Sequence, residues 1–124
     1  MPEKFSVKKR ARSFTYAFKG IKLLMQQHNA WIHLAATLVV VAAGFYFELR
    51  PGKWLATIIA IGMVWAAEAF NTAMEHLVDL VSPEQNETAG KVKDIAAAAV
   101  LITAIISVVI GCIVFVPEII SLFS

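Results

Sequence analysis

Residues 68–79 read EAFNTAMEHLVD, and they follow a stretch, residues 54–67, that carries no charged side chain. The polar side chains of this segment would share one face of a helix, within an arc of roughly 100° and a rise of about 16 Å. They are Glu68, Asn71, Thr72, Glu75 and Asp79. Carboxylates spaced along one face can bind a divalent cation, act as a general base, or do both. The opposite face is apolar, so the sequence predicts a membrane helix that ends in an acidic face.

The composition indicates an integral membrane protein. Of the 124 residues, 59% are hydrophobic, and the mean hydropathy is +0.71, whereas soluble domains contain about 45–50% apolar residues. The length fits one domain, residues 1–124. The single cysteine, Cys112, lies in an apolar run and excludes a disulfide framework. No cleavable signal sequence is expected, because the basic amino-terminal stretch lacks a short apolar core followed by a cleavage site.

Residues 6–27 predict an amphipathic helix that lies on the membrane surface. Apolar residues recur every three or four positions from Val7 to Met25, beside a parallel polar stripe. Much of the basic charge precedes residue 30, in Lys4, Lys8, Lys9, Arg10, Arg12, Lys19 and Lys22. With apolar spans directly downstream, this charge favours anionic lipid headgroups over nucleic acid as a partner. A soluble helix that binds a partner protein is the alternative.

Three further segments predict transmembrane helices, residues 29–49, 54–81 and 91–116. The expected fold is therefore an all-α membrane protein with an interfacial amino-terminal helix and three spans. Residues 50–52, Arg-Pro-Gly, are the expected turn between the first two spans. Proline cannot continue a helix pattern, so Pro83 is expected to close the second helix and Pro117 the third.

The depth of Glu68 follows from the length of the uncharged part of its span. Fourteen residues, 54–67, cover about 21 Å, whereas the hydrocarbon core is about 30 Å thick. Glu68 should therefore lie inside the membrane rather than in water. Acids in the membrane are costly and usually functional, so Glu68 is expected to be catalytic or to carry a proton. A hydrogen bond between helices is the structural alternative.

Positive charge orients the chain in the membrane. Only Arg50 and Lys53 lie on one side of the predicted spans, whereas Lys91, Lys93 and the amino-terminal cluster lie on the other. The positive side is normally cytoplasmic. The acidic face and the loop at 82–94 are therefore expected in the cytoplasm, where ATP and Mg²⁺ are available.

Other polar residues have a functional and a structural interpretation. Glu75 lies two turns from Glu68 and suits a metal ligand, or is a solvated acid. Asn71 could contact a phosphate or a metal, or could join two helices. In the run KVKD, residues 91–94, Lys93 is a point charge suited to nucleotide phosphates, and Asp94 could bind metal through water or hold the lysine. Lysines that flank a span are the alternative.

The histidines do not indicate a separate metal site, and the common nucleotide-binding motifs are absent from the sequence. His28 and His33 are expected at the interface and His76 at the surface, without the spacing of a metal site. Neither GxxxxGK[ST] nor GxGxxG occurs, which excludes a P-loop and a protein-kinase fold. Three spans are too few to enclose a nucleotide, so the acidic face of one subunit is expected to meet a helix of another.

The segment EAFNTAMEHLVD resembles the signature of the prokaryotic diacylglycerol kinase family, which includes undecaprenol kinases. That signature is Glu, two residues, Asn, Ser or Thr, a small residue, an aliphatic residue, Glu, and Asp four positions on, with Met74 a mild variant of the aliphatic position. The resemblance extends to RSFTYAFKG at 12–20, NAWIH at 29–33 and residues 82–94. It therefore covers almost the whole chain.

The resemblance implies a homotrimer in the bacterial inner membrane, with active sites shared between subunits on the cytoplasmic side. It assigns Glu68 as general base on the lipid hydroxyl and Glu75 as ligand of the metal on the ATP phosphates. Arg12, Asn71, Asp79, Lys93 and Asp94 match other active-site or nucleotide-contacting positions. The family usually has a further metal-binding glutamate near the start of the first span. Counting from His33 places this position at Gln27, and counting from Gly20 places it at His28.

The expected activity is transfer of the γ-phosphoryl group of MgATP to a membrane lipid alcohol, undecaprenol or diacylglycerol. Such a transfer mainly needs positioning and neutralisation of charge, which an acid-bound Mg²⁺ and a lysine supply. A small proton-coupled transporter that uses Glu68 is the alternative from another class. A non-catalytic membrane scaffold leaves the acidic face unexplained.

Overall fold

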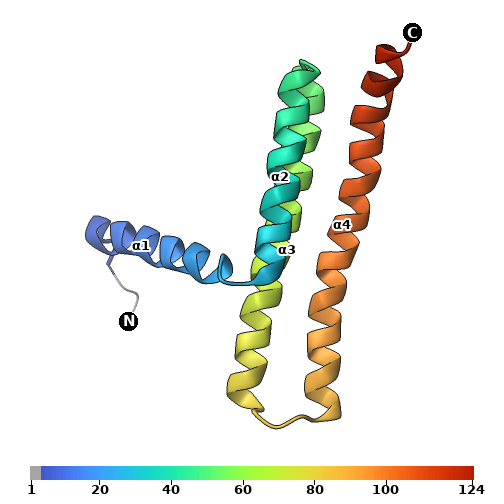
Figure 1. The fold of residues 1–124 in the computed structure, drawn as a ribbon. Helices are drawn as coiled ribbons and strands as arrows, with labels where there is room; N and C mark the ends of the chain where they lie inside the picture. Colours follow the sequence, from blue (N-terminus) through green and yellow to red (C-terminus); the bar gives the residue numbers. More distant parts are fainter. Residues whose placement is uncertain (1–3) are drawn as a thin grey trace.

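The protein is described by a computed structural model that places residues 4–124. Within this range the chain forms four α-helices, α1 (Val7–Leu24), α2 (His28–Tyr46), α3 (Pro51–Val81) and α4 (Glu87–Leu122). Helices α2, α3 and α4 run side by side, and α1 leaves them at a steep angle (Figure 1). Each of the three bundled helices is long and apolar enough to cross a membrane. The expected all-α membrane fold is confirmed.

Helix α1 forms as the apolar period predicts. The Ser6 hydroxyl accepts a hydrogen bond from the backbone N–H of Lys9 at 3.4 Å and so caps the first turn. None of the residues of α1 is buried, and the helix extends away from the bundle (Figure 1). A helix with one apolar and one basic face, free of the bundle, has the geometry of a helix that rests on a membrane surface.

The turn between α2 and α3 lies earlier than residues 50–52. Glu48 adopts a left-handed backbone conformation, with φ of 50°. The N–H groups of Glu48 and Leu49 then bond the carbonyls of Phe45 at 3.2 Å and Gly44 at 3.1 Å, the two bonds of a Schellman motif. Pro51 is the first residue of α3, because its fixed φ suits a helix start and its missing N–H has no partner there.

Helix α3 is the centre of the bundle, since both α2 and α4 pack against it. At the α2–α3 hairpin, Gly44 lies against Trp54, and a Cβ at Gly44 would be only 2.5 Å from the indole ring. At the other end α3 stops at Val81, before Pro83, as expected. The loop that follows is shorter than expected, because Asn86 caps α4 by accepting from the N–H of Ala89 at 2.8 Å.

Pro117 does not end α4, contrary to the expectation from sequence, because the helix continues to Leu122. Proline removes one hydrogen bond, but the residues beyond it keep theirs. The Lys53 ammonium donates to the Val114 carbonyl at 3.2 Å and to the Glu118 carboxylate at 2.8 Å. The contact with Glu118 attaches the segment after the proline to α3.

The interior of a single chain is small and partly polar. Among residues 4–124 the buried apolar side chains are few, whereas many large ones are exposed. In the part of the chain that the structure describes, all of the buried polar residues lie on α3, namely Thr57, Glu68, Asn71 and Thr72. The exposed apolar surface faces lipid or other subunits in a membrane, so the bundle concentrates its polar groups on the inner face of α3.

Candidate active site

The acidic face of α3 changes from buried to exposed along the helix. Glu68 is 2% exposed and Asn71 is 8% exposed, whereas Glu75 is half-buried and Asp79 is exposed. The end of α3 and the start of α4 also project past the level at which α1 meets α2 (Figure 1). A surface helix marks the membrane boundary, so this face runs from the membrane interior toward water.

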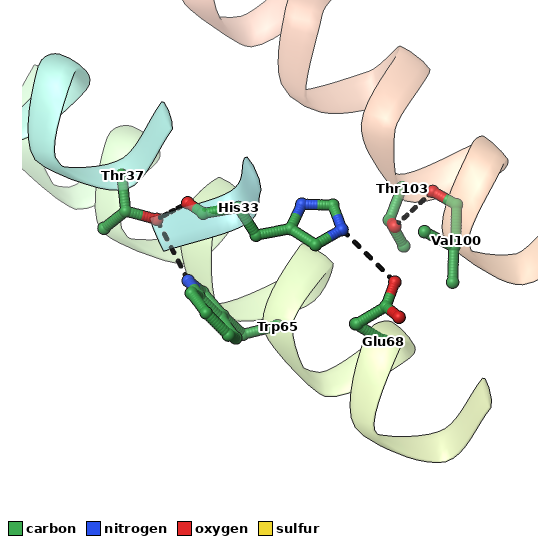
Figure 2. A network of polar contacts seen from close by, with 6 residues as sticks. All are labelled: His33, Thr37, Trp65, Glu68, Val100 and Thr103. Atoms are coloured by element: carbon green, nitrogen blue, oxygen red, sulfur yellow. Dashed lines mark hydrogen bonds and ion pairs between the residues drawn. The ribbon is translucent and has the colours of Figure 1, made fainter. Parts of the chain in front are cut away.

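Glu68 is held by a histidine from the neighbouring helix. The Nε2 atom of His33, on α2, lies 3.2 Å from Oε2 of Glu68, and the side chains are 20% and 3% exposed. The His33 ring meets the edge of the Trp65 ring at 5.9 Å between centroids. Trp65 donates through Nε1 to Thr37 Oγ1 at 3.0 Å, and Thr37 donates to the His33 carbonyl at 2.7 Å (Figure 2). Glu68 is therefore a carboxylate with a positioned nitrogen partner.

Sequence reasoning missed this role of His33, although a signal was present. His33 and Glu68 are 35 residues apart on different helices, so no local spacing connects them. Each lies about the same number of residues from the turn near residue 50. Two antiparallel helices joined there must bring them to one level, which the predicted spans already implied.

Asn71 lies one turn from both Glu68 and Glu75 and has an unused acceptor. Its Oδ1 atom is buried without a hydrogen-bond partner among the described residues. An unpaired buried acceptor costs about 1–3 kcal/mol, and native proteins rarely keep one without a functional reason. The oxygen is therefore available to a ligand, such as a hydroxyl group, a metal ion or its bound water.

The exposed end of the face carries a cation from α4. Lys93 donates to Asp79 Oδ1 at 2.7 Å, and the charge of Glu75 also attracts it. Both Asp79 and Lys93 line a polar hollow of about 500 Å³ beside the loop that joins α3 to α4. Asp94 follows on the same helix and is exposed. The short loop thus brings a lysine to the acidic face, where it supplies the positive charge that an anionic substrate requires.

The remaining predicted site residues are not gathered at this face within one chain. Arg12 is exposed on α1, which points away from α3 (Figure 1). Gln27 is half-buried at the start of α2 and makes no side-chain capping bond there, and His28 is exposed beside it. Across residues 4–124, no three His, Cys, Asp or Glu side chains converge on a common metal site.

Comparisons with known proteins indicate the enzyme class to which this chain belongs. The family model of prokaryotic diacylglycerol kinases matches residues 15–115. Undecaprenol kinase of Bacillus subtilis is 37% identical over 108 residues, which cover 86% of this chain and 88% of that protein. Diacylglycerol kinase of Synechocystis sp. is 34% identical over 112 residues, 89% of this chain and 64% of that protein. Diacylglycerol kinase of Escherichia coli (strain K12) is 30% identical over 105 residues, 79% and 81% of the two chains.

These relatives are lipid kinases, and they lend no support to the transporter alternative. The match covers the interfacial helix from residue 15, the first two spans and the third span as far as residue 115. This chain therefore belongs to the prokaryotic diacylglycerol kinase family and is a multi-pass membrane lipid kinase.

Proposed function

We propose that the chain transfers the γ-phosphoryl group of MgATP to the hydroxyl of a membrane lipid alcohol, at the cytoplasmic face of the bacterial inner membrane. The alcohol is undecaprenol or diacylglycerol, the two substrates that the names of its relatives indicate. The observation that carries the proposal is the contact of buried Glu68 with half-buried His33, one helical turn from the unused Asn71 oxygen. A buried carboxylate next to an open acceptor is suited to receive a lipid hydroxyl at the membrane boundary.

Glu68 acts as the general base in this proposal. Its carboxylate accepts the proton of the lipid hydroxyl as that oxygen bonds to the γ-phosphorus, while the bond from the γ-phosphorus to the bridging oxygen of ADP breaks. His33 holds one carboxylate oxygen at 3.2 Å, so the other is free to face the substrate. Asn71 Oδ1, one turn away, would be available to the metal ion or to its bound water.

Glu75 and Asn71 would hold the metal. Both present oxygen, the donor that Mg²⁺ prefers, and Mg²⁺ usually takes only one or two carboxylates and completes its shell with phosphate oxygens and water. A protein site with fewer than three acids therefore fits this ion. Bound Mg²⁺ would neutralise charge on the nucleotide phosphates. Gln27 is the proposed additional ligand from the start of α2, through its carboxamide oxygen.

Lys93, Asp79 and Asp94 surround the phosphates in this proposal. Lys93 is held at the rim of the polar hollow by Asp79, so a bound phosphate would meet an ammonium already in place. Arg12 would come from a neighbouring subunit, because α1 extends away from the α3 of its own chain (Figure 1). A homotrimer with active sites between subunits follows as part of the proposal.

Glu68→Gln tests the base directly, because the amide keeps the shape of the side chain and loses the proton acceptor. We expect phosphorylation of lipid alcohols to fall by about 10²–10⁴-fold in the purified variant. Binding of ATP and the oligomeric state should match the wild type. Retention of most of the turnover, measured with radiolabelled ATP in mixed micelles, would contradict the assignment of Glu68.

A further inference from the structure

A slot of about 200 Å³ opens between α2, α3 and α4 on the membrane side of the His33–Glu68 pair. His33 forms one end of the slot and Phe115 lies toward the other. On α3 it runs from Trp65 back to Thr57, a length of about 12 Å at the rise of an α-helix. The slot therefore leads from His33, the partner of the proposed base, into the part of the bundle that the hydrocarbon core surrounds.

Four of the polar residues that line the slot, Thr37, Thr57, Trp65 and Ser107, already donate hydrogen bonds within the protein. Thr57 donates to the Lys53 carbonyl at 2.8 Å, and Ser107 donates to the Ala60 carbonyl at 3.2 Å. Trp65 donates to Thr37, which in turn donates to the His33 carbonyl. None of these hydroxyl or indole donors remains for a ligand. The slot can therefore accommodate hydrocarbon, but none of these groups is available to donate a hydrogen bond to a carbonyl oxygen.

The size of the slot suits a short hydrocarbon segment. An apolar cavity of about 150 Å³ stays dry and takes up benzene, so a slot of about 200 Å³ can hold a segment of roughly six to eight carbon atoms. Because aliphatic and aromatic side chains line the slot, a hydrocarbon segment occupies it more favourably than water does.

We propose that this slot binds the hydrocarbon attached directly to the reacting hydroxyl, and that it selects polyprenol-type alcohols over diacylglycerol. The inference rests on the proposed function, because the hydroxyl must sit at Glu68 while the chain continues past His33 into the slot. In a polyprenol the carbons next to the hydroxyl are hydrocarbon. In a diacylglycerol they carry two ester groups, whose carbonyls would enter the slot without donors.

The wild-type enzyme should therefore distinguish alcohols by what lies next to the hydroxyl. With purified full-length protein in mixed micelles, we expect kcat/KM for undecaprenol to exceed that for 1,2-dioctanoylglycerol by at least about tenfold, the cost of one buried carbonyl without a partner. A long-chain n-alkanol, which also lacks esters, should be preferred over the diacylglycerol. Equal or reversed values of kcat/KM would overturn the inference.

Gly111 allows the slot to be filled without disturbing its walls. Gly111 lines the slot, and a Cβ at this position would meet nothing within 4 Å. Gly111→Leu should therefore occupy the space and lower kcat/KM for undecaprenol by about tenfold or more. Gly62→Leu is the matched control, because a Cβ at exposed Gly62 also meets nothing within 4 Å and Gly62 does not line the slot. The control should stay within about twofold of wild type.

Photocrosslinking separates failure of the slot from failure of the kinase proposal. A diazirine-bearing n-alkanol, with no ATP present, should label slot residues such as Ile110 in the wild type and in Gly62→Leu, but not in Gly111→Leu. Slot labelling without any lipid phosphorylation would defeat the proposed function and leave the binding site standing. Phosphorylation of undecaprenol without slot labelling would defeat the slot. A Gly111→Leu chain that loses its oligomeric state would show that the slot is a helix-packing surface, which also overturns the inference.

Discussion

Glu68 is the side chain whose surroundings carry most of the chemistry. A carboxylate that is 2% exposed would be strongly disfavoured without partners, and buried charge is normally hydrogen-bonded. His33 supplies that partner at 3.2 Å. The Trp65 ring packs against the His33 ring, and Thr37 donates to the His33 carbonyl and accepts from Trp65 (Figure 2). The order of these contacts makes His33 a positioning residue, which acts on the lipid hydroxyl only through Glu68.

His33 can be tested with a pair of substitutions that differ in hydrogen bonding. His33→Leu removes the donor, and we expect kcat to fall by about 10–100-fold, because a buried carboxylate loses a hydrogen bond worth about 1.5–3 kcal/mol. His33→Gln keeps an N–H that can reach Glu68, and it should recover most of that loss. The KM for ATP should be unchanged in both variants. Equal losses in the two variants would indicate that His33 contributes packing and not positioning.

Glu75 should respond to substitution in a different way from Glu68. Glu75→Gln weakens an anionic ligand of a hard cation, so the Mg²⁺ concentration at half-maximal rate should rise, by about tenfold, while high Mg²⁺ restores much of the activity. The measurement is the initial rate of lipid phosphorylation against Mg²⁺ at saturating ATP. An unaltered Mg²⁺ curve would mean that Glu75 is only a solvated acid.

Among the helices, α3 determines where the site lies. Its 31 residues span about 46 Å, which exceeds a hydrocarbon core of about 30 Å. The surplus carries the exposed end of the acidic face out of the membrane, to the level where Lys93 on α4 can meet Asp79. The tight reversal at Glu48 sets the register of α2 against α3 and so places His33 opposite Glu68.

The left-handed conformation of Glu48 predicts a gain in stability on substitution by glycine. A left-handed backbone costs an ordinary L-residue about 1–2 kcal/mol, whereas glycine adopts it freely. We expect the free energy of unfolding of Glu48→Gly to exceed that of Glu48→Ala by about 1 kcal/mol, so that Glu48→Gly unfolds at a higher temperature. Glu48→Ala is the control, since it also removes the carboxylate but keeps the Cβ. Thermal unfolding in detergent micelles, followed by circular dichroism, measures the difference, and equal midpoints would contradict the prediction.

The assembled protein must cover surfaces that a single chain leaves open. The described chain exposes many large apolar side chains, and lipid can cover those. Lipid cannot bring Arg12 to the acidic face, because α1 points away from the bundle (Figure 1). An active site that contains Arg12 and Glu68 together therefore requires a second subunit, as the proposed homotrimer provides.

Mixed oligomers test the shared site. Arg12→Ala and Glu68→Gln should each be inactive alone. When the two chains are unfolded together, mixed equally and refolded, about a quarter of the sites should combine an intact Arg12 with an intact Glu68 from the neighbouring subunit. The expected result is recovery of about a quarter of wild-type turnover. If Arg12 acts within its own chain, no site is repaired and the mixture stays inactive.

The amino-acid sequence by itself determined the fold class and the polar face of α3. Apolar length, helical period and charge asymmetry are local properties, so three spans, an interfacial helix and the shared face of Glu68, Asn71 and Glu75 follow from counting along the chain. The same counting misplaced the first turn and wrongly ended α4 at Pro117, because Glu48 takes an uncommon backbone conformation and Lys53 binds across to Glu118.

Only the tertiary structure decided which residues from different helices meet. Three features depend on the register between α2, α3 and α4. They are the contact of His33 with Glu68, the unused oxygen of Asn71 and the slot on the membrane side of them. That register is set by side-chain packing and by the geometry of the two reversals, and a shift of one turn moves each partner by about 5.4 Å. The sequence indicates that a carboxylate lies in the membrane, and the packing of the helices determines what holds it there.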